Sequence, residues 1–151
     1  MLVFICATFC FSSDKNPPVQ AIVEAGVVPI LVELLTRFDS PTLQLEAAWA
    51  ITNIACGDVE FARSLISCGV TPRLIDLIIR SPDVSVREQS MWAISNMSAD
   101  VAECRDLLLE VHTVDAMLWQ LGIECPAEHQ RDAPSLMAMR HISWTLSNLL
   151  R

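Results

Sequence analysis

The stretch WAITN at residues 49–53 recurs as WAISN at residues 92–96 and as WTLSN at residues 144–148. The first two copies start 43 positions apart, and the second and third start 52 apart. Self-similarity at a period of about 40 to 47 residues is typical of helical solenoids, in which each unit buries one face on the next. The longer interval indicates an insertion near residues 126–134, PAEHQRDAP, where polar residues lie between two prolines. We therefore predict an all-α solenoid of about three repeats.

Two shorter helical segments precede each copy of the motif, which predicts three helices per repeat. Gly26 and Gly69 fall just past the first of these segments, where a left-handed residue commonly ends a helix. His112 takes the place of the glycine in the third repeat. Pro29 and Pro72 lie in the first turn of the next helix, where a missing N–H costs little. The expected helices are 19–25, 28–37, 59–68, 71–80, 101–111, 114–123 and 135–151, and the other two motif helices are expected to begin after 39–41 and 81–83.

These helices divide the chain into repeats at residues 15–57, 58–100 and 101–151, preceded by an apolar stub at residues 1–14. The stub, which begins MLVFICATFCF, is interpreted as part of a preceding helix or as a misassigned start of the chain. The alternative is a signal-peptide core that is cleaved near Ser13 in a secreted protein. That alternative is disfavoured because the segment lacks positively charged residues at its start and a small-x-small cleavage site. No run reaches transmembrane length, so no membrane partner is expected.

The composition favours a folded helical chain with a cationic partner. Hydrophobic residues make up 52% of the chain and charged residues 19%, which disfavours disorder. The net charge is −8. Nucleic acid is therefore not expected as a partner, because neutralising phosphates requires a basic surface.

The sequence carries no pattern of a metal site or of a catalytic centre. The six cysteines form no CxxC pair and have no histidine at zinc-finger spacing. The three histidines, His112, His129 and His141, accompany no nucleophile motif. We expect no metal, no cofactor and no enzymatic activity, and we expect reduced thiols in a protein of the cytoplasm and nucleus.

The motif tryptophans and asparagines share one face of their helices. At about 100° per residue, Gln89, Asn96 and Asp100 all fall within roughly 80° of Trp92. The same offsets group a second and a third set of residues on the other two motif helices. These sets are Glu46, Trp49, Asn53 and Gly57 in the first repeat, and His141, Trp144 and Asn148 in the third.

A ladder of Trp and Asn on neighbouring helices can bind an extended basic peptide. Asn offers a donor and an acceptor to a peptide backbone. Neighbouring indoles form slots for the stems of Lys or Arg, and each indole face attracts the cation by about 0.5 to 2 kcal/mol. Asp100 is then placed to select a lysine. The alternative is that the tryptophans pack in the core, but a buried asparagine needs partners, which disfavours core positions for a repeated amide.

Several stretches resemble the first three armadillo repeats of importin alpha, the nuclear-import adaptor family, over residues 15–151. They are the three Trp-Asn motifs, NPP at 16–18, EAGVVPILVELL at 24–35 and REQSMWAISNMSAD at 87–100. The resemblance implies a right-handed superhelix of armadillo repeats and a major site for Lys/Arg-rich nuclear localisation signals. It places that site on Trp49, Asn53, Trp92, Asn96, Trp144 and Asn148. It also implies roles for Gln89 beside the array, for Gly57 in admitting the peptide, and for Asp100 as the partner of the key lysine.

The sequence departs from the family's pattern at three points. His141 stands where the family usually has Asn, and its protonation is expected to weaken the binding of cationic peptides. Ala62 replaces a usual Thr beside the lysine pocket, which removes one hydrogen bond worth about 0.5 to 1.5 kcal/mol. The basic segment that binds importin beta in the family has no counterpart here, so importin beta is not expected to bind by that route.

Two further expectations concern the ends of the solenoid and the alternative function. Repeats without a polar capping unit expose an apolar face, so self-association is expected. The alternative to a cargo-binding adaptor is a truncated or degenerate armadillo scaffold that keeps the fold but has lost transport.

Overall fold

The computed structural model describes residues 19–99, 102–129 and 133–151, and within these ranges the regular structure is entirely helical. The stub at residues 1–14 and Asp100 lie outside the described residues. So does the middle of the expected insertion, at residues 130–132. The helices in chain order are α2 (Val19–Glu24), α3 (Val27–Leu35), α4 (Pro41–Ala55), α5 (Val59–Ser67), α6 (Val70–Arg80), α7 (Val84–Met97), α8 (Ala102–Glu110), α9 (Thr113–Gln120), the short 3₁₀ helix η1 (Ala127–His129) and α10 (Leu136–Leu149).

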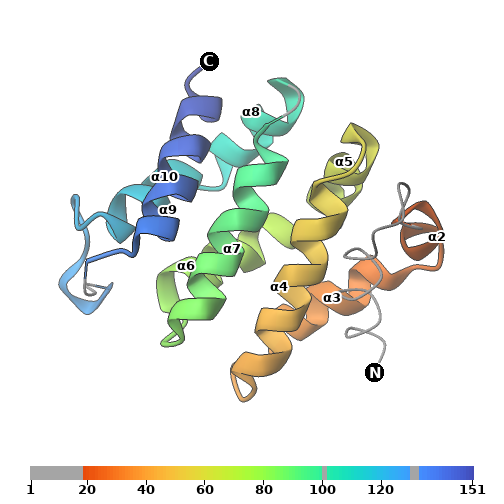
Figure 1. Cartoon of the computed structure of the whole chain (residues 1–151), viewed down its shortest axis with the longest axis horizontal. Coiled ribbons are helices and arrows are strands. Elements are labelled where there is room, and N and C mark those ends of the chain that lie inside the picture. The colour runs from red at the N-terminus through yellow and green to blue at the C-terminus, as the bar shows by residue number, and fades with distance from the viewer. Residues whose placement is uncertain (1–18, 100–101, 130–132) are drawn as a thin grey trace.

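The three helices that carry the motif, α4, α7 and α10, lie side by side (Figure 1). Helix α7 is in the middle and packs against both of the others. Equivalent helices of successive repeats also stack, since α3 contacts α6, α6 contacts α9, and α5 contacts α8. These helices therefore meet their counterparts one repeat further along the chain, as in a solenoid. This arrangement confirms the prediction of an all-α solenoid with three helices per repeat.

Left-handed residues separate the first helix of each repeat from the second. Gly26 has φ 72° and Gly69 has φ 76°, and His112 adopts φ 59° at the same point of the third repeat. Glycine adopts this region without a steric cost, whereas a side chain with a Cβ is strained there. The expected glycine caps are therefore present, and His112 replaces glycine in conformation as well as in sequence.

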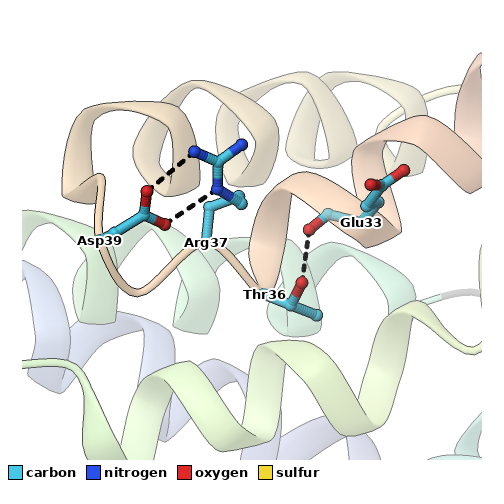
Figure 2. A network of polar contacts seen from close by, with 4 residues as sticks. All are labelled: Glu33, Thr36, Arg37 and Asp39. Atoms are coloured by element: carbon cyan, nitrogen blue, oxygen red, sulfur yellow. Dashed lines mark hydrogen bonds and ion pairs between the residues drawn. The ribbon is translucent and has the colours of Figure 1, made fainter.

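The turn between α3 and α4 is fixed by local polar contacts (Figure 2). Arg37 donates to both carboxylate oxygens of Asp39, from Nε at 2.9 Å and from Nη2 at 2.8 Å. Thr36 donates from Oγ1 to the carbonyl oxygen of Glu33 at 2.7 Å and so caps the end of α3. These contacts end α3 at Leu35, two residues before the end expected from the sequence, because Arg37 lies in the turn.

The third helices begin at side-chain or proline signals and bury their apolar faces in a continuous core. Asp83 accepts hydrogen bonds from the backbone N–H groups of Ser85 and Val86 at the start of α7, and Ser135 accepts one from Ala138 at the start of α10. The core between the helices is made of fully buried aliphatic and methionine side chains. It includes Leu31, Ile51, Leu74, Leu77, Ile94, Met97, Leu108 and Met117.

Polar contacts also join successive repeats away from the motif. Gln120 on α9 donates to the carbonyl oxygen of Ile78 on α6 at 2.9 Å. Arg63 on α5 lies 3.1 Å from the carboxylate of Glu103 on α8. None of the helices in the described ranges is long and apolar enough to cross a membrane.

Candidate peptide-binding face

The motif tryptophans lie on three neighbouring helices, and two of them are exposed. Trp92 on α7 is 39% exposed and Trp144 on α10 is 55% exposed, whereas Trp49 on α4 is partly buried. An indole exposed to this extent contributes little to the core, because apolar side chains stabilise a fold through the area they bury. Trp92 and Trp144 are therefore not core residues, and the alternative of ordinary core packing does not apply to them.

The polar residues beside Trp92 bind the preceding repeat. Asn96 donates from Nδ2 to the carbonyl oxygen of Thr52 on α4 at 3.1 Å, and Gln89 donates from Nε2 to Oγ1 of Thr52 at 2.8 Å. The Thr52 hydroxyl in turn donates to the carbonyl oxygen of Ala48 at 2.8 Å. Asn96 and Gln89 thus clamp α7 to α4 through one residue. Oδ1 of Asn96 makes no hydrogen bond within the described part of the chain and stays available as an acceptor.

Asn148 differs from the sequence expectation of a surface amide. It is only 1% exposed. Nδ2 of Asn148 donates to Oγ of Ser98 at 3.3 Å, and Ser98 donates to the carbonyl oxygen of Ser95 at 2.7 Å. Oδ1 of Asn148 accepts from Nη2 of Arg151 at 2.8 Å. A peptide can therefore reach this amide only if Arg151 moves away from it.

The hydrogen bonds of Asn96 and Asn148 lead to equivalent acceptors in the preceding repeat. Thr52 and Ser95 each directly precede the motif asparagine of the earlier repeat. Asn96 reaches the Thr52 carbonyl directly, whereas Asn148 reaches the Ser95 carbonyl through the hydroxyl of Ser98. These acceptor residues were not predicted from the sequence. The available signal was the hydroxyl residue before each motif asparagine, in WAITN, WAISN and WTLSN.

The first repeat has the same polar positions without such partners. Nδ2 of Asn53 and Oε2 of Glu46 are buried and have no hydrogen-bond partner in the described ranges. These residues occupy the positions of Asn96 and Gln89, one repeat earlier. Buried donors and acceptors are normally satisfied, so these two atoms mark a face of α4 that is suited to polar contacts.

Gly57 follows α4 and lies against Phe61 on α5. A Cβ at Gly57 would lie 2.7 Å from Cδ2 of Phe61, so any larger residue must displace that ring. Close packing against Phe61 is therefore sufficient to require glycine here. It adds a local reason to the role in peptide approach that the family resemblance implies, and that role remains a prediction.

His141 reaches across from α10 and stacks on Trp92. The ring centroids are 5.3 Å apart and the planes are inclined by 20°. Burial lowers the pKa of His141, the positive charge of Arg140 lowers it further, and Glu88 opposes both. His141 is therefore neutral at physiological pH, and its ring covers part of the indole that was expected to bind a lysine stem.

Glu88 on α7 is the acidic group whose charge acts on His141. Oε1 of Glu88 accepts a hydrogen bond from the hydroxyl of Ser135 at the start of α10. Glu88 thereby joins α7 to α10. No group of three or more His, Cys, Asp or Glu residues that could hold a metal ion occurs in the part of the chain that the structure describes.

Comparison with known proteins identifies the fold family. The family profile of the Armadillo/beta-catenin-like repeat matches residues 15–56 and 58–99. A designed armadillo repeat protein in complex with the peptide (KR)4 superposes with a TM-score of 0.81 at 27% identity, over 97% of this chain and 55% of that chain. A computationally designed armadillo repeat protein for modular peptide recognition gives the same TM-score at 25% identity, over 97% of this chain and 56% of the other.

Natural relatives agree with the designed ones. Over 140 residues, 93% of its length, the chain is 42% identical to importin subunit alpha-2 of Arabidopsis thaliana and 41% identical to importin subunit alpha-1a of Oryza sativa subsp. japonica. It spans only 24% and 25% of the lengths of these relatives. The resemblance to importin alpha is thus confirmed, and the family is a non-enzymatic one. The chain belongs to the armadillo repeat family, and its repeats are of the importin alpha kind.

Proposed function

We propose that this chain binds extended Lys/Arg-rich peptides of the nuclear-localisation-signal kind across α4, α7 and α10, as part of protein import into the nucleus. The observation that carries the proposal is the exposure of Trp92 and Trp144, at 39% and 55%, on adjacent helices. Two exposed indoles in equivalent positions provide aromatic faces and apolar walls for the stem and charge of a basic side chain. The division into repeats at residues 15–57, 58–100 and 101–151 belongs to the same proposal.

Charge and similarity support a basic ligand. The net charge of −8 favours the approach of a cationic peptide. One designed relative was solved with the alternating Lys-Arg peptide (KR)4, and the natural relatives are importin alpha subunits. Localisation in the cytoplasm and nucleus follows from the proposal, and Asp100 remains its expected partner for a signal lysine.

The experiment that tests the proposal is a fluorescence-anisotropy titration with a labelled Lys-rich signal peptide. A scrambled peptide of the same composition and charge is the control. We expect micromolar or tighter binding of the signal peptide and much weaker binding of the scrambled one, because slots at fixed spacing read the order of the residues. Equal binding of the two peptides would show that the interaction is non-specific and electrostatic, and it would contradict the proposal.

A second candidate is an armadillo scaffold that has lost transport. It is favoured by the burial of Asn148, whose amide is engaged by both Ser98 and Arg151. Under this alternative the asparagines only join repeats. Arg151→Ala distinguishes the two candidates, because it frees Oδ1 of Asn148. If the face is a binding site, this variant should bind the peptide more tightly than the wild type. If the chain is only a scaffold, neither protein should bind the peptide.

A further inference from the structure

The stack of His141 on Trp92 occupies the side of the indole that faces α10. His141 belongs to α10 and Trp92 to α7, so the imidazole approaches from the direction of Trp144. A centroid distance of 5.3 Å at 20° is an offset-stacked aromatic contact, which leaves no room for another side chain between the two rings. A lysine stem entering between Trp92 and Trp144 must therefore displace His141.

His141 does not cover the opposite face of the Trp92 indole, because a stacked ring covers one face only. The two slots between successive tryptophans thus differ, although the sequence repeats the same motif at each. The stack depends on His141, because the matching positions in the other two motif helices are Glu46 and Gln89, which carry no ring.

We propose that His141 is a specificity-determining residue, which closes the slot between Trp92 and Trp144 to lysine and so confines the basic side chains of a bound peptide to the rest of the face. This inference rests on the proposed function, since it concerns how the same face reads a peptide. The ligand it selects is an extended peptide with one dominant lysine and with a small uncharged residue at the slot between Trp92 and Trp144.

The charge of His141 adds a pH dependence to this selection. The charged groups that act on it are Arg140 on its own helix and Glu88 on α7. Neutral His141 closes the slot between Trp92 and Trp144 by stacking alone. The protonated ring places a cation on the face of Trp92 and repels a lysine nearby. Peptide affinity should therefore fall as the pH is lowered through the pKa of His141, which lies below its usual 6.5, while the peptide lysines stay charged.

The test is an alanine scan of a Lys-rich peptide against the wild-type chain and two variants, His141→Ala and His141→Phe. With the wild type, one lysine position should dominate. With His141→Ala, a second lysine position should become important, with a loss of about 2- to 30-fold when that lysine is replaced, as expected for one cation–π contact. His141→Phe keeps an aromatic stack without a charge, so it should retain the wild-type pattern of positions and lose the pH dependence.

The chain contains a matched control in His129, which stacks on Trp119 away from the motif helices. The ring centroids of this pair are 5.9 Å apart and the ring planes are inclined by 22°. His129→Ala removes a similar stack and should change neither the pattern nor the pH profile. If the wild type binds the signal peptide but His141→Ala leaves the positional pattern unchanged, the inference about His141 is wrong and the proposed function stands. If wild type and variants alike fail to distinguish the signal peptide from its scrambled control, the proposed function itself fails.

Discussion

Asn96 donates from Nδ2 to the carbonyl oxygen of Thr52 at 3.1 Å, so the amide that the motif repeats ties one armadillo repeat to the next. The same carbonyl also accepts from the backbone N–H of Cys56 at 3.1 Å within α4. The contact uses only the donor half of the amide. Asn96 can therefore join the repeats and still offer Oδ1 to a bound peptide, which means that its replacement affects both stability and binding.

Asn96→Ala should lower the free energy of unfolding by about 0.5 to 1.5 kcal/mol, the usual net contribution of one hydrogen bond. Asn96→Asp should cost more, because a carboxylate cannot donate and would face the Thr52 carbonyl. Urea denaturation followed by circular dichroism measures both. A midpoint that is the same in Asn96→Ala and the wild type would show that the contact adds no stability.

The contact between Gln89 and Thr52 can be isolated by a double-mutant cycle. Gln89→Leu and Thr52→Val each remove one partner of the 2.8 Å hydrogen bond, while the backbone carbonyl of Thr52 stays available to Asn96. We expect a coupling free energy of about 0.5 to 1.5 kcal/mol from the denaturation of the two single variants and the double variant. Strictly additive effects would contradict a direct bond between the two side chains.

Features of this face that lie within one helix could be predicted from the sequence, whereas contacts between two helices could not. The shared arc of Trp92 and Asn96 follows from the period of one helix, and the left-handed conformation at His112 follows from alignment with Gly26 and Gly69. The partner of Asn96 could not be predicted in this way. It depends on the rotation of α7 relative to α4, which the periodicity of a single helix does not specify.

Asn148 illustrates the same limit more strongly. Its burial results from Ser98 on the preceding repeat and from Arg151 beyond the end of α10. Neither residue belongs to the repeated motif. The stack of His141 on Trp92 likewise joins two helices. The sequence showed only that His141 stands where the family usually has Asn, and this did not predict a contact with Trp92.

The Arg37–Asp39 pair in the turn of Figure 2 predicts an acidic titration. The hydrogen bond from Arg37 is the main cause that lowers the pKa of Asp39 from 3.8 to about 2. A carboxyl whose pKa is lowered in the folded state stabilises the fold fully above its unfolded pKa, and this contribution is lost as the pH falls from 3.8 to about 2. Arg37→Ala should return the pKa of Asp39 towards 3.8, measured by NMR titration of its carboxyl carbon. A pKa still near 2 in this variant would show that another group holds it down.

The exposed apolar side chains of α10 should cause self-association. Leu136 is 76% exposed and Met139 is 47% exposed, and both line a surface hollow together with Trp144. Contiguous exposed apolar surface promotes contact between chains. Sedimentation velocity should show an average mass that rises with concentration for the wild type and less so for Met139→Asp. Ile30→Asp changes a residue of similar exposure, 48%, on α3 and serves as the control. A wild type that remains monomeric at every concentration would contradict this expectation.

The most direct test of the central claim is the affinity of a Lys-rich signal peptide for the wild type, Trp144→Ala and Phe38→Ala, compared by fluorescence anisotropy. Trp144 and Phe38 are both about half exposed, so neither replacement should change the free energy of unfolding by more than about 0.5 kcal/mol. We expect Trp144→Ala to weaken peptide binding by about 10-fold, through loss of one aromatic wall against which the peptide packs, while Phe38→Ala binds like the wild type. Equal affinities for all three proteins would show that the exposed indoles of this face do not bind the peptide.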